Sequence, residues 1–155
     1  MNHSHLYLAS KDHIFIFALK DMQLERRLKT PNHLLRISLG PTGLAYSDVL
    51  DHGKIIVANI AQQETWKDIV VSKHFPVQKI KFNQKGDLLA TQCAHENLIK
   101  IYSKNTEMYC TLQITGCYEL VDMAFCPNLR FLICLLREKD IDYLQLFDLN
   151  SGKDT

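Results

Sequence analysis

The stretch that decides the fold is VQKIKFNQKGDLLATQCAHENLIKIYSK, residues 77–104. Two apolar runs flank the polar turn NQKGD, and a third run follows in which apolar and polar residues alternate. Alternating β-branched and aromatic residues favour strands, and Gly86 stands where a turn most easily adopts a positive φ. The pattern predicts four consecutive strands, over Val77–Phe82, Leu88–Cys93, Leu98–Ser103 and Met108–Ile114.

Similar runs recur along the chain at a nearly constant interval. The run apolar-x-apolar-aromatic-polar has copies spaced 41, 44 and 45 residues apart, anchored at Phe17, Ala58, Tyr102 and Phe147. A second series lies between these copies with an interval of 43 residues, anchored at Leu39, Phe82 and Phe125. A period of 40–45 residues with four short strands per unit is typical of a β-propeller blade.

The repeat count predicts an all-β chain, a partial WD-repeat-type β-propeller of about three and a half four-stranded blades. We expect a partial blade over 1–30, blades over 31–71 and 72–116, and a partial blade over 117–155. The opening run HLYLASKDHIFIFAL is expected to form the inner two strands of its blade, and the last blade to stop after three strands. Since closed propellers have roughly four to eight blades, we expect the chain to be part of a propeller: a fragment, a truncated isoform, a split-gene product or a half that assembles with another chain.

The composition of the chain limits the classes of protein to which it can belong. The 155 residues are 46% hydrophobic and 23% charged, as expected of a globular chain that buries a core. The net charge of +1 gives no basic excess of the kind that nucleic-acid binding requires. The five cysteines are odd in number and form no C-x-x-C pair, which favours free thiols in a reducing compartment over a disulfide framework. We expect no signal peptide and no transmembrane segment, and hence a cytoplasmic protein.

Three stretches of the sequence go beyond a generic repeat: IFIFALKDMQLERRLKTPNH (14–33), LRISLGPTGLAYSD with GKIIVANI after it, and FPVQKIKFNQKGDLLATQCAHENLIKIYS (75–103). In these stretches the chain resembles the PROPPIN (WIPI-like) family of phosphoinositide-binding WD-repeat propellers. The third stretch is similar to the family pattern S-P-I-x-x-I-x-F-N-x-x-G-x-L-L-A-T-A-S-x-x-G-T-L-I-R-I-F. The resemblance implies a non-enzymatic adaptor that binds phosphatidylinositol 3-phosphate and 3,5-bisphosphate on endosomal or pre-autophagosomal membranes and recruits autophagy proteins.

The chain departs from the family at its lipid-binding motif. PROPPINs carry an aromatic residue or Leu, then Arg-Arg-Gly, after the fourth strand of this blade, and each arginine serves one headgroup pocket. Here Gln113, Ile114 and Thr115 occupy those positions, and only Gly116 matches. Because Ile114 offers no donor to a phosphate, the departure predicts weakened lipid binding.

Other headgroup candidates survive by position, and we include Thr115 and Gly116 among them. Lys73 and His74 lie where the family has a His before its Ser-Pro pair. Asn97 replaces the Thr and Lys100 the Arg of the T-L-I-R-I-F run, and His95 is nearby. Lys and His bind phosphate as point charges rather than forks. The alternative for each is a solvated residue of a turn or strand end.

Two hypotheses of function follow, and both lack a cofactor, a metal site and catalytic residues. In the first, the chain is a PROPPIN-like adaptor at phosphoinositide-containing membranes. In the second, it is a WD-repeat interaction scaffold or truncated paralogue without lipid binding, which docks a partner or a second copy through an open blade edge. No Walker loop, G-x-G-x-x-G or G-x-S-x-G motif points to an enzyme.

Overall fold

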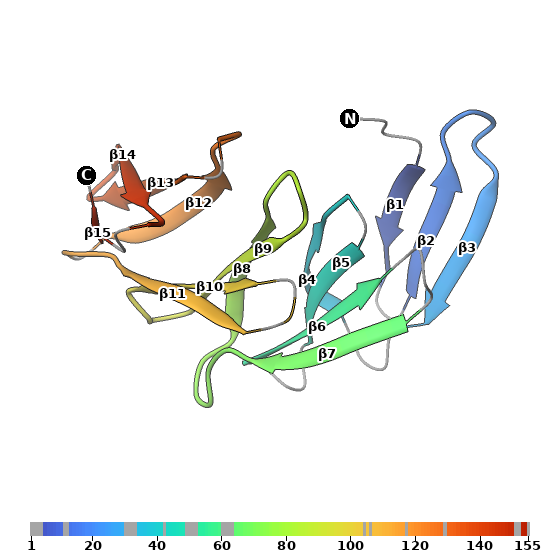
Figure 1. Ribbon diagram of the computed structural model, residues 1–155, viewed down its shortest axis with the longest axis horizontal. Coiled ribbons are helices and arrows are strands. Elements are labelled where there is room, and N and C mark those ends of the chain that lie inside the picture. The colour runs from blue at the N-terminus through green and yellow to red at the C-terminus, as the bar shows by residue number, and fades with distance from the viewer. Residues whose placement is uncertain are drawn as a thin grey trace.

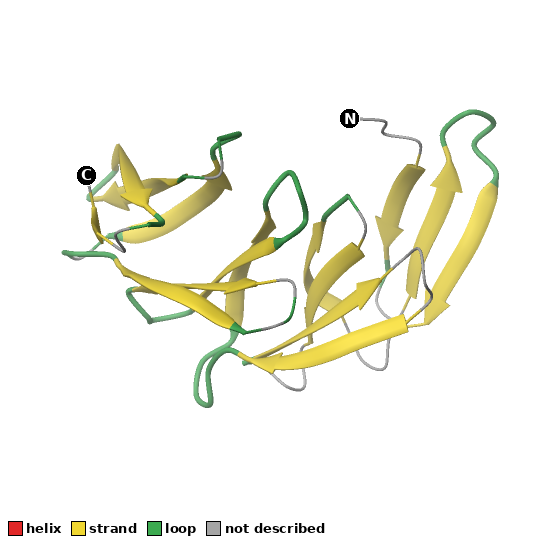
Figure 2. Cartoon of the chain, viewed as in Figure 1, coloured by secondary structure: helices red, strands yellow, loops and turns green. Residues whose placement is uncertain are grey.

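The structure is a computed structural model of the whole chain. It describes residues 5–10, 13–29, 34–41, 43–48, 53–59, 64–103, 105, 107–116, 118–128, 130–150 and 153–154. In these residues every regular element is a strand, and all strand pairs are antiparallel (Figure 2). No helix in this part of the chain is long and apolar enough to cross a membrane.

The strands form four sheets that follow one another in chain order along an arc (Figure 1). The first sheet has three strands, β1 (His5–Ala9), β2 (His13–Ala18) and β3 (Leu24–Lys29). The second has four, β4 (Leu34–Leu39), β5 (Gly43–Asp48), β6 (Lys54–Asn59) and β7 (Glu64–Val70). The third comprises β8 (Val77–Phe82), β9 (Leu88–Cys93), β10 (Leu98–Ser103) and β11 (Met108–Gln113). The fourth comprises β12 (Glu119–Phe125), β13 (Phe131–Glu138), β14 (Ile141–Asp148) and β15 (Lys153–Asp154).

This architecture is that of a partial propeller, and it confirms the predicted fold class. Each four-stranded sheet is a simple meander, and the first strands β4, β8 and β12 of neighbouring sheets contact one another. The four strands predicted from residue 77 onward are present, the last ending one residue earlier than expected.

Two details of the blade count were wrong. The repeat places β2 level with the third strands β6, β10 and β14, so β1 and β2 correspond to middle strands and not to the inner two. The fourth sheet also has a short fourth strand, because β15 pairs with β14 through Phe147 and Asp148. The hydrophobic pattern identified each strand, and the order of the strands in a blade follows from the pairing within each sheet.

Turn chemistry fixes the hairpins. In the NQKGD turn, Asn83 Oδ1 accepts hydrogen bonds from the backbone N–H of Asp87 and Leu88, and Gly86 adopts a φ of 74°. Between β13 and β14, Lys139 and Asp140 have φ values of 48° and 66°. Two consecutive positive φ values are the mark of a type I′ turn, whose twist matches that of the flanking strands.

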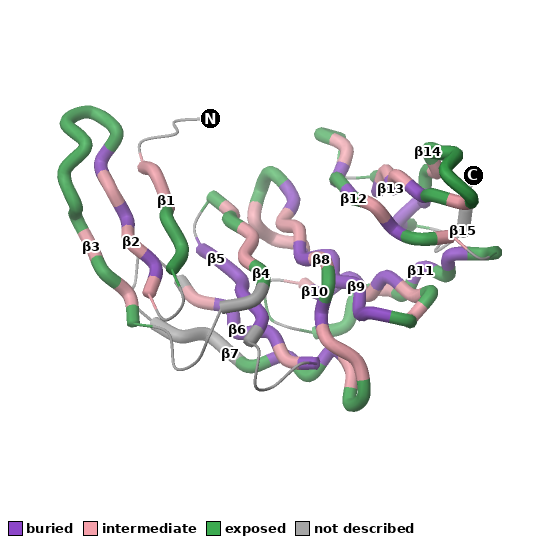
Figure 3. Tube along the Cα trace, turned by 180° about the vertical axis from the view of Figure 1, so that it is seen from behind, coloured by how far each residue is buried: buried purple, intermediate pink, exposed green. Residues whose placement is uncertain are grey.

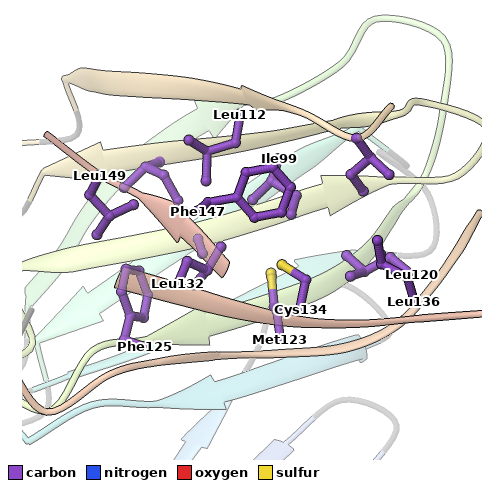
Figure 4. Close-up of a cluster of buried hydrophobic side chains, with 13 residues drawn as sticks. Ile99, Leu112, Leu120, Met123, Phe125, Leu132, Cys134, Leu136, Phe147 and Leu149 are labelled. Carbon is purple, nitrogen blue, oxygen red and sulfur yellow. The ribbon is translucent and has the colours of Figure 1, made fainter. Parts of the chain in front are cut away.

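The core lies between sheets. Figure 4 shows the cluster between the third and fourth sheets, in which the fully buried Phe147 lies against Ile99 and Leu112 of the preceding sheet. A second cluster joins the second and third sheets around Tyr102, and a smaller one joins the first and second around Ile14. Each sheet is therefore stabilised mainly by burial of its apolar faces against its neighbours.

The cysteines fit the prediction of free thiols as far as they are described. Cys93 and Cys134 are buried in the inter-sheet clusters, Cys110 and Cys126 are partly buried, and all four are unpaired. Cys117 lies outside the described residues.

Candidate functional site

Apart from Lys100, which lies on β10, the candidate headgroup residues lie on three connections at one end of the third sheet. These connections are the linker 71–76 before β8, the turn 94–97 between β9 and β10, and the segment that follows β11. Because β8 and β10 begin at this end while β9 and β11 finish there, an antiparallel meander brings all three connections together. Figure 2 shows these connections as loops at the strand ends.

The first group of candidates surrounds the ring of Phe75. The His74 ring lies edge-on to Phe75 with centroids 6.4 Å apart, and the His95 ring lies 5.8 Å from Phe75 on the turn. Lys73 is exposed on the same linker. His95 has a φ of 58°, which holds the turn in a left-handed conformation. The structure therefore brings the exposed His74 and His95 to one aromatic ring, with the exposed Lys73 next to His74 in the chain, and we call these four residues the Phe75 cluster.

A carboxylate ties the linker to the turn beneath this cluster. Ser72 Oγ donates to Glu96 Oε1 at 2.7 Å and accepts from the backbone N–H groups of His74 and Phe75. Lys100 Nζ lies 3.1 Å from Glu96 Oε2 and also donates to the carbonyl oxygen of Val71. The charge of Lys100 is thus already paired with a carboxylate of its own sheet, and its side chain joins two neighbouring blades.

The second group lies where the family has its arginine pair. The carbonyl oxygen of Asn97 accepts from the Ile114 backbone N–H and from Gln113 Nε2, and Asn97 Nδ2 donates to the Gly116 carbonyl at 3.4 Å. Ile114 is only 2% exposed and packs in the cluster between the third and fourth sheets. Thr115 and Gly116 are exposed. Residues 113–116 thus place backbone and amide groups at the surface, with no cationic side chain among them.

Gly116 is required by its backbone and its surroundings. Its φ is 101°, and a Cβ at this position would lie 2.6 Å from a ring carbon of Tyr118. The glycine that survives from the family motif therefore has a conformational role that does not depend on a ligand.

Sequence reasoning missed Glu96, Ser72 and Phe75. The family pattern has a glycine at the position of Glu96, so the signal was available: an acidic residue four positions before the candidate Lys100. A headgroup argument based on position alone assigns Lys100 to a ligand, whereas the structure pairs it with Glu96. The role of Ser72 depends on the path of the linker, which the sequence does not specify.

Burial raises the pKa values of two side chains near the turn 94–97, those of Cys93 and Tyr102. It raises the pKa of the Cys93 thiol to about 12, an effect that nearby Glu96 adds to and Lys100 opposes. Burial likewise raises the pKa of Tyr102 to about 12, with smaller contributions from Cys93 and Glu96. Both groups stay protonated at neutral pH and act here as core residues.

Among the described residues, no three His, Cys, Asp or Glu side chains are grouped so that they could hold a metal ion.

Comparison with known proteins addresses the fold. No family profile and no curated protein matches the chain. Solved structures do match, among them Kluyveromyces lactis Hsv2 with its loop 6CD replaced by a Gly-Ser linker, at 19% identity and a TM-score of 0.79. The alignment covers 99% of this chain and 50% of Hsv2. A complex of KlAtg21 with the coiled coil of AgAtg16 matches at 18% identity and a TM-score of 0.79, covering 99% of this chain and 52% of that chain.

A third neighbour carries a different function. The Kuenenia stuttgartiensis hydrazine synthase matches at 15% identity and a TM-score of 0.78, covering 98% of this chain and 45% of that chain. One fold thus serves unrelated activities, so likeness at this level of identity does not transfer a function. The chain spans about half the length of the solved structures that it matches, and it has the fold of a partial β-propeller.

Proposed function

We propose that this chain is a non-enzymatic adaptor of the PROPPIN type that binds protein partners of the autophagy machinery. The observation that carries the proposal is the sequence resemblance over residues 75–103, which points to this family independently of the fold. The likeness of nearly the whole chain to KlAtg21, which was solved in complex with the AgAtg16 coiled coil, agrees with it and names the class of partner to test. The buried clusters between the sheets hold the blades together, and the Phe75 cluster lies at the surface of the third sheet.

Isothermal titration of the folded chain with an Atg16-type coiled coil tests this proposal. We expect saturable 1:1 binding in which a helical segment lies on the propeller surface. A scrambled peptide of the same composition is the control. Equal heats for the coiled coil and the scrambled peptide would contradict the proposal.

A membrane role at a phosphoinositide surface is the second candidate function. The Phe75 cluster favours it, because His74 and His95 are exposed next to one aromatic ring and Lys73 is exposed beside His74 in the chain. One lysine and two imidazoles without an arginine fork bind a phosphate weakly. The buried Ile114 and the pairing of Lys100 with Glu96 both reduce the charge available to a headgroup. In this role the protein is cytoplasmic and binds peripherally to endosomal or pre-autophagosomal membranes.

Vesicle flotation separates the two roles. Vesicles that contain phosphatidylinositol 3-phosphate or 3,5-bisphosphate are compared with vesicles of phosphatidylcholine alone. We expect weak binding that depends on the phosphoinositide and that the double substitution Lys73→Ala, His74→Ala abolishes. Lys139→Ala, in the exposed β13–β14 turn, is the matched control and should bind as the unsubstituted chain does. Equal flotation with and without the phosphoinositide would remove the lipid role and leave a scaffold that binds protein alone.

A further inference from the structure

Two apolar residues that are buried in the third sheet have exposed equivalents in the fourth, which is the last sheet. Ile99 and Ile101 of β10 are both fully buried because the following sheet packs on them. Counted from the anchors Tyr102 and Phe147, their equivalents on β14 are Leu144 and Leu146. These two residues are 71% and 38% exposed. The outer face of the fourth sheet thus carries apolar residues at positions that elsewhere in the chain form an inter-blade contact.

The outer face of the first sheet also carries exposed apolar residues, at positions where the third and fourth sheets pack on the sheet before them. The equivalents of Phe17 are Tyr102 and Phe147, and both are buried against the sheet that precedes them. Phe17 itself is only partly buried. The register pairs Phe17 with Leu24 and Phe15 with Leu8, and these two leucines are 51% and 49% exposed. Figure 3 shows that β3 and β14, in the first and last sheets, are largely exposed, in contrast to β5 and β9.

The charges on the two faces are of opposite sign. On the first sheet, Arg27 lies over the Phe15 ring at 5.7 Å, and Lys29 pairs with His13 in the register. On the outer face of the last sheet Asp142 pairs with Arg137 and Asp148 with Arg130, so that Glu119 gives this face an excess of one negative charge. Opposite charges favour an encounter between these faces and disfavour the pairing of either face with itself.

We propose that a second copy of this chain docks on these faces, with the last sheet of each copy packed on the first sheet of the other. Each contact repeats the face-to-face arrangement that already joins neighbouring sheets within the chain. Two such heterologous contacts related by a two-fold axis close a ring. The chain spans 45–52% of the length of the solved structures that it matches. The proposal concerns self-assembly and does not depend on the protein or lipid partner.

Sedimentation equilibrium of the purified chain is the first test. We expect one reversible species at twice the 17.9 kDa mass of the chain. A single species at the chain mass would overturn the proposal. A broad series of larger masses would also overturn it, since heterologous contacts that do not close give open assemblies.

Two substitutions test which faces meet. Leu144→Lys alters the last sheet and Leu8→Glu alters the first, and both side chains are exposed within one copy. Each should weaken dimerisation at least about tenfold, equivalent to about 1.4 kcal/mol. Tyr109→Lys changes a residue on β11 that is 51% exposed and should leave the dimer unchanged. Circular dichroism of each variant checks that the fold is intact.

Mixing the two weakened variants is the decisive experiment. In the mixed dimer one contact holds both substitutions, Lys facing the sheet that carries Glu, while the other contact is unaltered. We therefore expect the mixture to recover dimer at concentrations where each variant alone is monomeric. If each face paired with its own kind, one variant would stay dimeric alone and mixing would recover nothing, which would contradict the proposed arrangement.

Discussion

Lys100 of β10 and Glu96 of the preceding turn form an ion pair with 3.1 Å between Nζ and Oε2, and each side chain is only 17% exposed. The same ammonium donates to the Val71 carbonyl of the neighbouring blade, and the same carboxylate accepts from Ser72. The pair therefore links three segments and leaves little charge for an outside ligand.

Loss of the lysine should destabilise the fold. In Lys100→Met, Glu96 keeps its partly buried position but loses its cation, and the Val71 carbonyl loses its donor. We expect the free energy of unfolding in urea to fall by about 1–3 kcal/mol. Lys85→Met, on the exposed β8–β9 turn, is the control and should change stability by no more than about 0.5 kcal/mol. Similar losses for the two variants would mean that the ion pair contributes nothing specific.

Gly53 should tolerate no side chain. A Cβ there would lie 1.8 Å from the Ser72 carbonyl oxygen, and the Gly53 carbonyl accepts from the N–H groups of Val71 and Ser72. Relief of the clash requires the backbone to move, so Gly53→Ala should cost about 3 kcal/mol in thermal or urea unfolding. Gly40→Ala meets only the movable Phe82 ring at 3.0 Å, and we expect about 1 kcal/mol. Equal costs at the two positions would show that the contact with Ser72 is not decisive.

Two Arg–Asp pairs of the last sheet should differ in their effect on stability. Asp148 is 5% exposed, accepts two hydrogen bonds from Arg130 and also accepts from the Asn150 backbone. Asp148→Ala should therefore lower the free energy of unfolding by about 2 kcal/mol. Asp142 binds Arg137 in a similar way but is exposed, and Asp142→Ala should cost clearly less. A larger loss at Asp142 would contradict the burial argument.

The buried thiols should make stability fall in alkaline solution. Burial raises the pKa of Cys93 and of Cys134 from 9.0 to about 12, so above pH 9 the unfolded chain loses these protons while the folded chain keeps them. The stabilisation is complete below pH 9 and is lost as pH rises toward 12. Urea unfolding of the unsubstituted chain and of Cys134→Ala, measured between pH 8 and 11, checks this. The decline with pH should be shallower in the variant, and parallel curves would contradict the assignment.

The reactivity of the Cys93 and Cys134 thiols tests their burial in a second way. At pH 8 a disulfide reagent should leave Cys93 and Cys134 unmodified in the folded chain and should modify both in urea, because the thiolate is the reactive form. Rapid modification of either residue without unfolding would mean that it is not buried as the structure has it.

The sequence alone determined the repeat and therefore the fold class. Strands such as Leu98–Ser103 alternate apolar and polar residues, turns such as Asn83–Asp87 carry their glycine where φ is positive, and the anchors recur every 41–45 residues. These are local properties, and a strand or turn forms from its own residues and their period. The candidate residues on the connections 71–76 and 94–97 came instead from the resemblance to the family, position by position.

The tertiary structure decided which side chains meet and which charges remain available. Position along the chain assigned Lys100 to a ligand, but the fold pairs it with Glu96 and Val71. The order of strands in the first blade was misassigned for β1 and β2, although the anchor Phe17 already placed β2 with the third strands β6, β10 and β14. Leu144 and Ile99 occupy equivalent repeat positions, yet one is 71% exposed and the other fully buried, since burial depends on what packs against a face. Local sequence fixes strands and turns, whereas contacts between segments distant in the chain arise only once the sheets are stacked.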